Sequence, residues 1–337
     1  MRAARLQRAR EVRIEEVPTP QPGPGEVLVR VRACSICHSD VLIYETGEGS
    51  GGAVPPGPFI QGHEFAGEVV ALGPQTEGPA PGTRVAVDPC WHCGECDMCR
   101  RGLTNICRHI VFPSFPPRDG ALAEYLACPA FSLCPLPDNV SFTEGALLEP
   151  LGVGVHALRL AGPIQGLRVA VLGAGMIGAG VLALAHRQGP GELAVVEPVA
   201  WRREFAQSLG AEPAVAAIGE LLDRGWEADV VVECAGETDS LEQALELVGP
   251  GGRIVMIGIP QVDRISFPAP LARRKEVNLL FSRRSRQTLP ECVELVARGE
   301  VNLRAFPTRT FSLEQTAEAL EATAARPGDM LRAIVIP

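Results

Sequence analysis

The sequence has no long apolar run and almost no lysine. No stretch approaches the roughly 20 apolar residues that a helix needs to cross a bilayer, so we expect no membrane-spanning segment. Lys275 is the one lysine, and this arginine bias is compatible with a GC-rich genome or a hot habitat and diagnostic of neither. The net charge is −9, which is unfavourable for binding nucleic acid or an anionic membrane.

Cellular location and size can also be inferred from the sequence. Residues 1–5 are basic but are not followed by an apolar segment, so we expect no secretory signal and a cytoplasmic protein. There the 11 cysteines would be reduced, which favours metal ligation over disulfides. A chain of 337 residues exceeds what one hydrophobic core usually organises, so we expect two domains.

The N-terminal part has the pattern of short strands separated by turns. Residues 26–32 alternate apolar and polar side chains, and further strand candidates lie at 68–72, 84–87 and 123–127. Clusters of proline and glycine, as at 18–25, separate such segments. This pattern predicts a β-rich, barrel-like domain.

The pattern changes at about Gly162. Short apolar runs occur at 168–172, 193–197, 229–233, 253–257 and 277–281. They alternate with helical stretches, and another helix and a final strand are expected at 287–298 and 331–336. Short buried strands that alternate with helices predict a parallel sheet of βαβ units.

A glycine-rich turn joins the strand 168–172 to a helix. The turn has the pattern G-x-G-x-x-G, which lets the backbone approach a pyrophosphate at the helix N-terminus; its candidate cofactor residues are Gly173, Gly175, Met176, Ile177 and Gly178. Glu197 follows about 20 residues later, where a carboxylate binds the ribose hydroxyls of NAD and repels the additional phosphate of NADP. Arg202 and Arg203 could hold a phosphate, but we favour a solvated helix face because Glu197 precedes them.

Four cysteines form a compact metal-binding pattern. Three follow one another at intervals of three residues and the fourth comes eight residues later: Cys93, Cys96, Cys99 and Cys107. Four thiolates suit tetrahedral zinc with no open position, whereas buried free cysteines would rarely show this spacing in a polar stretch. We therefore expect a structural zinc ion that holds a loop.

A second set of possible ligands is dispersed along the chain: Cys37, His63, Glu64 and Glu149. A catalytic zinc needs about three protein ligands and one open position. Each of these residues alone could simply be a packed side chain. Their neighbours favour a site, because residues 37–40 place a thiol, a hydroxyl and a carboxylate together, and Gly-His-Glu at 62–64 directly precedes a strand.

With these motifs in this order, the chain resembles the zinc-containing medium-chain dehydrogenases over nearly its whole length. The resemblance rests on the G-H-E-x-x-G segment at 62–67, the four-cysteine lobe and the glycine-rich turn at 173–178. It implies an α/β fold with two domains. A GroES-like, β-rich catalytic domain would comprise 1–153 and 286–337, and a Rossmann domain with a doubly wound parallel sheet would comprise 154–285.

Within this family the sequence looks most like the sorbitol (L-iditol) dehydrogenase branch, through the segments 115–120, 136–142 and 144–151. The resemblance implies an enzyme that transfers hydride from a secondary alcohol of the polyol type to NAD, with one catalytic and one structural zinc per chain. Cys37 and His63 would be ligands of the catalytic zinc. Glu64 or Glu149 would complete its shell, directly or through water.

The same resemblance implies roles for further residues. Ser39 would accept the proton of the substrate hydroxyl, and Phe112 and Arg284 would contact the substrate. The chain departs from the family at two positions. Leu42 stands where a histidine often continues the proton relay, and His38 stands where polyol enzymes commonly have glycine and simple alcohol dehydrogenases have histidine.

Several alternatives stay open. The same chemistry could act on threonine at its 3-hydroxyl, on an amino-cyclitol or on a simple alcohol. A zinc-free quinone or enone reductase using NADPH shares the two-domain architecture but lacks the Cys37, His63 and Glu64 set. A redox or zinc sensor without activity would use only the cysteine lobe. By analogy with the family, we expect a homodimer or homotetramer whose partner is a small alcohol.

Overall fold

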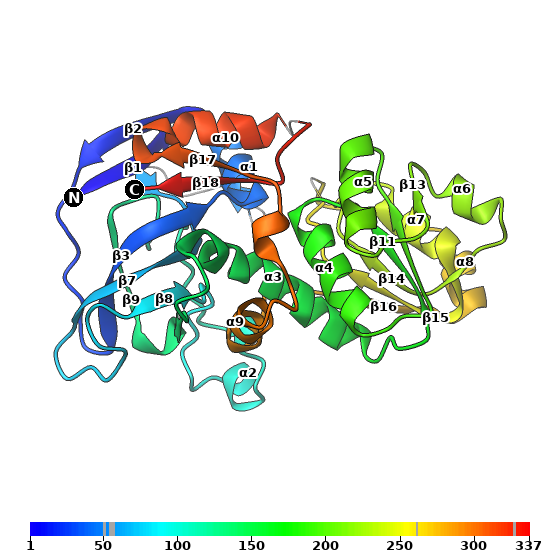
Figure 1. The fold of residues 1–337 in the computed structure, drawn as a ribbon, viewed down its shortest axis with the longest axis horizontal. Coiled ribbons are helices and arrows are strands. Elements are labelled where there is room, and N and C mark those ends of the chain that lie inside the picture. Colours follow the sequence, from blue (N-terminus) through cyan, green and yellow to red (C-terminus); the bar gives the residue numbers. More distant parts are fainter. Residues whose placement is uncertain (50–51, 54–57, 261, 326–327) are drawn as a thin grey trace. The chain divides into compact units, whose positions relative to one another are not determined.

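The chain folds into two compact units. The computed structural model describes residues 1–337 except 50–51, 54–57, 261 and 326–327 (Figure 1). One unit comprises Met1–Glu149 and Arg286–Pro337, and the other comprises Pro150–Ser285. Each unit contains its own sheet and its own buried core.

The first unit is built on a seven-stranded sheet whose strands come from both ends of the chain. Its order is β10-β8-β7-β3-β18-β17, and β9 also pairs with β3. The strands are β3 (Glu26–Ser35), β7 (Glu64–Leu72), β8 (Arg84–Val87), β9 (Tyr125–Pro129), β10 (Leu133–Pro135), β17 (Thr308–Ser312) and β18 (Arg332–Ile336). β18 pairs antiparallel with β3, Ile334 opposite Ser35 and Val335 opposite Cys34, so the C-terminal segment is part of this sheet.

Smaller elements complete this unit. A three-stranded sheet has the order β2-β1-β6, and its strands are β1 (Arg2–Arg8), β2 (Glu11–Glu16) and β6 (Phe59–Ile60). A short ribbon pairs β4 (Glu48–Gly49) with β5 (Gly52–Ala53). The helices are α1 (His38–Thr46), α2 (Asp97–Arg100), α9 (Leu289–Ala297) and α10 (Thr316–Ala324), with 3-10 turns at Thr104–Ile106, Ala130–Ser132, Leu303–Ala305 and Leu313–Gln315.

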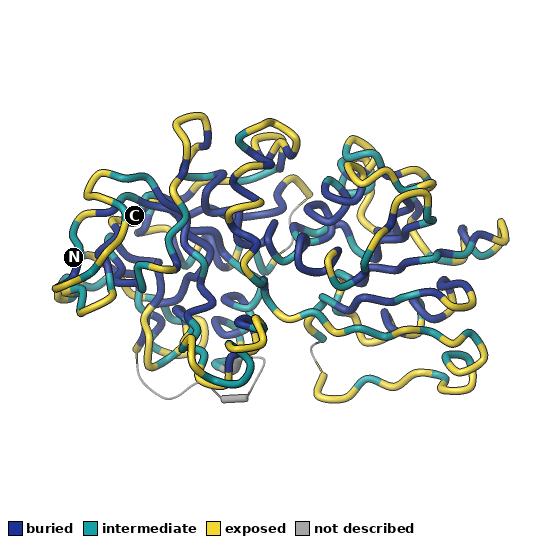
Figure 2. Tube along the Cα trace, turned by 90° about the horizontal axis from the view of Figure 1, so that it is seen from below, coloured by how far each residue is buried: buried dark blue, intermediate teal, exposed yellow. Residues whose placement is uncertain are grey.

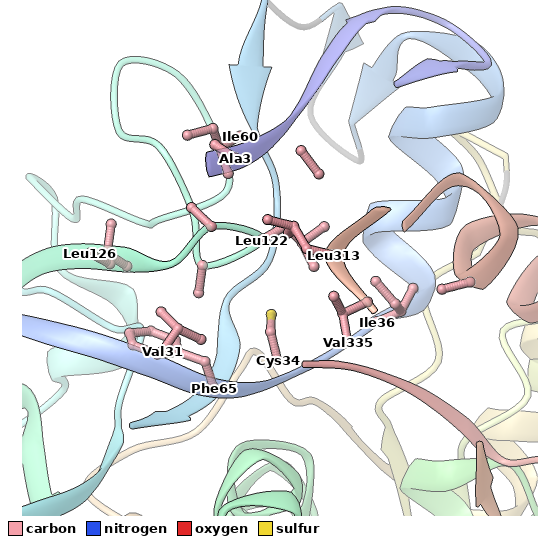
Figure 3. Close-up of a cluster of buried hydrophobic side chains, with 14 of the residues drawn as sticks. Ala3, Val31, Cys34, Ile36, Ile60, Phe65, Leu122, Leu126, Leu313 and Val335 are labelled. Carbon is pink, nitrogen blue, oxygen red and sulfur yellow. The ribbon is translucent and has the colours of Figure 1, made fainter. Parts of the chain in front are cut away.

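The core of the first unit gathers apolar side chains from strands far apart in sequence. Figure 3 shows Ala3, Cys34, Phe65, Leu122 and Val335 around one apolar centre. Phe65 is 1% exposed, and burying an aromatic side chain of this size contributes about 2–3 kcal/mol. The alternation of residues 26–32 is explained by this core, because Val27, Val29 and Val31 point into it.

The second unit contains a six-stranded parallel sheet with the order β13-β12-β11-β14-β15-β16. Its strands are β11 (Arg168–Leu172), β12 (Glu192–Val196), β13 (Ala214–Val215), β14 (Ala228–Glu233), β15 (Val248–Met256) and β16 (Asn278–Phe281). Its helices are α4 (Met176–Arg187), α5 (Ala200–Ser208), α6 (Gly219–Leu222), α7 (Ser240–Leu247) and α8 (Ala269–Lys275). The central strands are buried, whereas many connections are exposed (Figure 2).

The chain begins this sheet at a central strand, β11, and adds strands first on one side of it and then on the other. From β11 the chain proceeds to β12 and β13 on one side, and β14 to β16 lie on the other side. A doubly wound sheet therefore has its switch point between β11 and β14, where such folds bind nucleotides. The prediction of a β-rich part and a doubly wound parallel sheet is confirmed.

Helix α3 (Phe142–Ala161) continues from one unit into the other. Across the part of the chain that the structure describes, no helix combines the length and the apolar character needed to span a bilayer.

Candidate active site

Cys37 lies at the start of α1, directly after strand β3. The carboxylate of Asp40 accepts a hydrogen bond of 3.0 Å from the Cys37 backbone N–H, and the Cys37 carbonyl accepts one of 3.1 Å from the Asp40 N–H. This reciprocal pair fixes the first turn of the helix and with it the position of the half-buried thiol. Ser39 lies half-buried in the same turn, two residues from Cys37.

His63 and Glu64 lie at the start of β7. The residue before them, Gly62, has a backbone conformation and surroundings that require glycine. Gly62 has φ of 96°, and a Cβ there would lie 2.7 Å from the Cys34 sulfur. Ligand atoms of Cys37, His63 and Glu64 all lie within 4.8 Å of one another, close enough for one metal ion. The structure thus brings together three of the four residues predicted from the sequence.

Asp40 is a buried carboxylate that faces the His63 ring. Its Oδ1 lies 3.6 Å from His63 Nδ1 and accepts a 2.7 Å hydrogen bond from the Ser114 hydroxyl. Burial opposes ionisation of Asp40, but the nearby His63 outweighs it and lowers the pKa of Asp40. Burial likewise opposes a charged His63, yet Asp40 and Cys37 raise the pKa of His63 well above its ordinary value. The side chains around His63 therefore stabilise a positive charge, which suits a cation at this position.

Both oxygens of the Glu64 carboxylate have protein partners. The Ser35 hydroxyl donates to Oε2, and Arg332 Nη2 donates to Oε1 over 2.8 Å. The Arg332 and Glu64 side chains are 6% and 1% exposed, so this is a fully buried ion pair. Each carboxylate oxygen has two lone pairs, so these bonds leave acceptor capacity for a metal ion.

Glu149 lies in α3 and is also buried, at 7% exposure. Burial, followed by the charge of Glu64, raises the pKa of Glu149 to about 8. Among the described residues, the group with ligand atoms within 4.8 Å includes Glu64 and leaves out Glu149.

Phe112 packs against a member of the metal-binding group. Its ring centroid lies 4.9 Å from that of His63, at an interplanar angle of 51°. Phe112 thereby forms an apolar surface beside the candidate metal position. Arg284 follows β16 in the second unit, with φ of 55°, and its predicted contact with substrate stays a prediction.

Ser35, Ser114 and Arg332 are site residues that the sequence reasoning missed. Arg332 gave one signal, because it stands within the apolar segment 331–336, where a charged side chain requires a partner. The two serines gave none, since a serine hydroxyl is common in loops and strand ends.

The four lobe cysteines form a cluster with the dimensions of a zinc site. The Sγ···Sγ distances are 3.5 Å for Cys96–Cys99 and Cys93–Cys107, 3.8 Å for Cys96–Cys107 and 3.9 Å for Cys93–Cys99. Tetrahedral zinc with Zn–S bonds of about 2.3 Å requires S···S distances of about 3.8 Å. Backbone N–H groups of Cys99 and Arg108 lower the pKa of Cys96 to about 6, which favours the thiolate that binds metal.

The glycine-rich turn lies at the carboxyl end of β11. Gly173 has φ of 88°, and a Cβ on Gly178 would collide with the carbonyl oxygen of Gly173. Gly175 is the N-cap of α4, whose first residues are Met176 and Ile177. The tight turn and the helix N-terminus, where Gly173, Gly175 and Ile177 are half-buried, are the features that an incoming pyrophosphate needs.

Glu197, which follows β12, is tied to this turn. Its Oε2 accepts a 2.7 Å hydrogen bond from the Ala174 N–H, and its Oε1 accepts a 2.9 Å bond from the Val199 N–H. Arg203 Nη1 donates to the carbonyls of Glu197 and Pro198, at 2.7 Å each. The guanidinium of Arg202 lies 5.4 Å from the centroid of the Trp201 ring.

Comparison with known families and sequences gives consistent results. The family described as alcohol dehydrogenase GroES-like domain matches residues 23–138, and the zinc-binding dehydrogenase family matches residues 177–298. A sorbitol dehydrogenase of Bacillus subtilis is 34% identical over 100% of this chain and 97% of its own. An L-idonate 5-dehydrogenase of Vitis vinifera is 32% identical over 98% of this chain and 93% of its own.

Solved structures resemble the whole chain as well. A zinc-binding dehydrogenase of Sinorhizobium meliloti bound to NADP has a TM-score of 0.89 and 30% identity, covering 100% of this chain and 99% of its own. An Escherichia coli oxidoreductase of unknown specificity has a TM-score of 0.92 and 32% identity, covering 99% and 98%.

Proposed function

Because the chain belongs to the zinc-binding, GroES-like alcohol dehydrogenase family, we propose that it oxidises a secondary hydroxyl of a polyol with NAD as the hydride acceptor. The family makes it a zinc-dependent oxidoreductase. The observation that carries the proposal is the convergence of Cys37, His63 and Glu64 within 4.8 Å beside a buried acid. The similarity to sorbitol and L-idonate dehydrogenases supports a polyol as substrate.

Three residues would hold the catalytic zinc, and the chemistry of their donor set fits it. Cys37 supplies a sulfur, His63 a nitrogen and Glu64 a carboxylate oxygen, all donors that zinc accepts. When bound, zinc supplies Lewis-acid polarisation that makes a substrate hydroxyl easier to deprotonate. We place Glu64 directly in the shell because it belongs to the close group. Glu149 would then contact the zinc through water.

The remaining residues have roles in orientation and proton transfer. Asp40 orients the His63 ring from its Nδ1 side, at 3.6 Å. Ser39 would accept a hydrogen bond from the substrate hydroxyl and pass its proton onward, since Ser39 lies in the first turn of α1, which begins directly after Cys37. Phe112 would shield the side of His63 from water and contact the substrate there. Contact of Arg284 with the substrate is a separate part of the proposal.

The cofactor contacts lie in the second unit. Glu197 is held by two backbone N–H groups with its carboxylate at the glycine-rich turn, which suits ribose hydroxyls and opposes the phosphate of NADP. Arg203 already donates to two backbone carbonyls, which supports the preference for NAD. Gly173, Gly175, Met176, Ile177 and Gly178 would receive the pyrophosphate, with Arg202 near the ribose.

The four-cysteine lobe would hold a second zinc ion without an open position. Its role is to fix the loop between β8 and β9, because four thiolates complete a tetrahedral shell. Arg108 donates two hydrogen bonds to Asp97, of 2.6 and 2.8 Å, which stabilise the lobe.

We also propose a cytoplasmic homodimer or homotetramer. Phe281 on β16, the last strand of its sheet among the described residues, is 66% exposed, and a sheet edge with a large apolar side chain is suited to contact with a second copy. Light scattering coupled to size-exclusion chromatography tests the assembly, and a monomer at micromolar concentration would contradict it.

Initial rates across a substrate panel test the proposed activity. Sorbitol, xylitol, iditol, threonine and ethanol are each offered with NAD and with NADP, and we expect turnover of at least one polyol with NAD. Activity with ethanol alone would contradict the polyol substrate. Faster rates with NADP would contradict the cofactor. Metal analysis should find two zinc ions per chain, one at each cluster.

A further inference from the structure

Glu233, the last residue of β14, is a buried carboxylate that joins two loops. It is 0% exposed. Its Oε1 accepts hydrogen bonds of 2.7 Å from the N–H groups of both Ala235 and Gly236, and its Oε2 accepts one of 3.2 Å from the N–H of Gly258. One side chain therefore links the loop after β14 to the loop after β15.

Backbone contacts leave these two loops little freedom to separate. The Glu233 carbonyl accepts from the N–H groups of Ile257 and Gly258, at 2.8 and 3.1 Å. A Cβ on Gly258 would collide with the Gly236 nitrogen, and a Cβ on Gly236 would lie 2.7 Å from the Ile259 carbonyl oxygen. The loops are in direct backbone contact, with the Glu233 carboxylate between them.

The loop after β14 also packs on the glycine-rich turn. The Cys234 N–H donates to the Leu172 carbonyl over 2.8 Å, and a Cβ on Gly173 would lie 3.1 Å from Ala235. On its other side the turn is bonded to Glu197 through Ala174. Two carboxylates, each at the end of a strand next to β11, thus hold the backbone that surrounds the turn.

The position of Glu233 in the sheet relates it to one half of the cofactor. β14 borders the switch point, and a dinucleotide lies across the carboxyl ends of the strands there. The adenosine half would lie on the side of β12, where Glu197 stands, so the nicotinamide half would lie on the side of β14 and β15. The loops that Glu233 joins follow these two strands.

We propose that Glu233 is a positioning residue for the nicotinamide half of NAD, holding residues 234–236 and 257–258 in one shape before the cofactor arrives. This role rests on the proposed use of NAD. A preformed loop binds more tightly than one that must be ordered on binding, because the ordering entropy is already lost. Burying a carboxylate in this position is otherwise unfavourable.

The chain offers a matched control on the same strand. Asp229 is near the opposite, amino end of β14, and its Oδ2 accepts a 2.7 Å hydrogen bond from the Arg168 N–H. Asp229→Asn and Glu233→Gln both replace a carboxylate that accepts from backbone. Only the second lies at the edge where a nucleotide binds.

The test compares the affinities of the two zinc-loaded variants and the wild type for NADH and for ADP, by calorimetry. In E233Q the side-chain amide offers one acceptor oxygen in place of two, so the carboxylate link between the two loops is lost on one side and the Gly258 N–H keeps only the Glu233 backbone carbonyl as acceptor. We expect the Kd for NADH to rise about tenfold and that for ADP to change less than about twofold. D229N should change neither. An equal effect of E233Q on NADH and ADP, or equal effects of E233Q and D229N, would overturn the role.

A second measurement separates local order from overall stability. Hydrogen exchange at Ala235, Gly236 and Gly258 should be faster in E233Q, while exchange within β11 is unchanged; unchanged exchange at these three amides contradicts the role. If E233Q does not fold, E233D is tested in the same way. Wild-type protein that fails to bind NADH would refute the proposed function itself. Tight binding by the wild type and E233Q alike would refute only the role of Glu233.

Discussion

At the scale of single residues, the active-site acids have different partners and therefore different chemistry. Asp40 has its pKa lowered by His63, Glu64 accepts hydrogen bonds from Ser35 and Arg332, and Glu149 has its pKa raised to about 8. A sequence shows that acids are present but not which of them is paired. For this reason the sequence left the choice between Glu64 and Glu149 open.

Two variants decide between these glutamates. We expect Glu64→Gln to reduce the zinc content from two ions per chain to one and to lower kcat/KM more than about 100-fold, because a direct ligand is lost. Glu149→Gln should keep both ions and lower kcat/KM about tenfold. Elemental analysis and initial rates provide the measurements. The reverse pattern of zinc loss would make Glu149 the ligand.

Glu149 also makes the stability of the metal-free protein depend on pH. Its folded pKa of about 8 lies above the ordinary 4.5, so between these values the unfolded chain has released a proton that the folded chain retains. Stability therefore falls as pH rises through this window. Urea midpoints of zinc-stripped protein should decline more steeply from about pH 5 to pH 8 in the wild type than in E149Q. Parallel curves would show that Glu149 does not control the trend.

At the scale of elements, local patterns predicted most of the second unit. The runs at 168–172 and 229–233 became β11 and β14 because parallel strands buried on both faces are continuously apolar. The long helix α3 was missed, since it contains Gly145 and Pro150, which usually oppose helix formation. A Cβ on Gly145 would lie 2.7 Å from Ala66, so tertiary packing explains this glycine.

The N-terminal hairpin of β1 and β2 was also missed. Its register joins residues only a few positions apart, Leu6 opposite Val12, but the other edge of β1 pairs with β6, more than 50 positions along the chain. Pairing at such a distance is set by the packed core. The periodicity of a short sequence window therefore cannot predict it.

The four-cysteine lobe would be held in shape by its zinc ion. Loss of this ion should reduce stability without removing the zinc at the catalytic site. We expect Cys96→Ser to remove one of two zinc ions and to lower the melting temperature on the order of 10 °C. Cys134→Ser, a half-buried cysteine in β10, serves as the control and should keep both ions. Scanning calorimetry and elemental analysis test this. Full zinc content in C96S would show that three thiolates suffice.

At the scale of the whole molecule, the C-terminal segment completes the unit that contains the metal-binding group. β18 pairs with β3, and its Arg332 bonds Glu64 from 268 positions away. Neither the pairing nor the bond could be predicted from the sequence, because several apolar strands could equally have received β18. The resemblance to the family predicted that residues 286–337 return to the first domain, and the structure identifies β3 as the strand that pairs with β18.

Replacing Arg332 should therefore affect stability and metal binding together. We expect Arg332→Met to lower the free energy of unfolding by about 3–5 kcal/mol, because it leaves the Glu64 carboxylate buried without its cation. Arg332→Lys should restore part of this loss. Urea titrations and zinc affinity, measured on both variants, provide the readout. A wild-type midpoint in R332M would mean that zinc alone neutralises Glu64.

The place of β18 in chain order has a consequence for biosynthesis. The ribosome makes β3 early and β18 only after all of residues 150–285, so the N-terminal sheet must wait with the end of β3 at Cys34 and Ser35 lacking its β18 partner while the nucleotide-binding half can already fold. A nascent chain in that interval exposes backbone donors and acceptors that another strand could capture. Slow translation through the second unit would lengthen this exposure and increase the demand for chaperones.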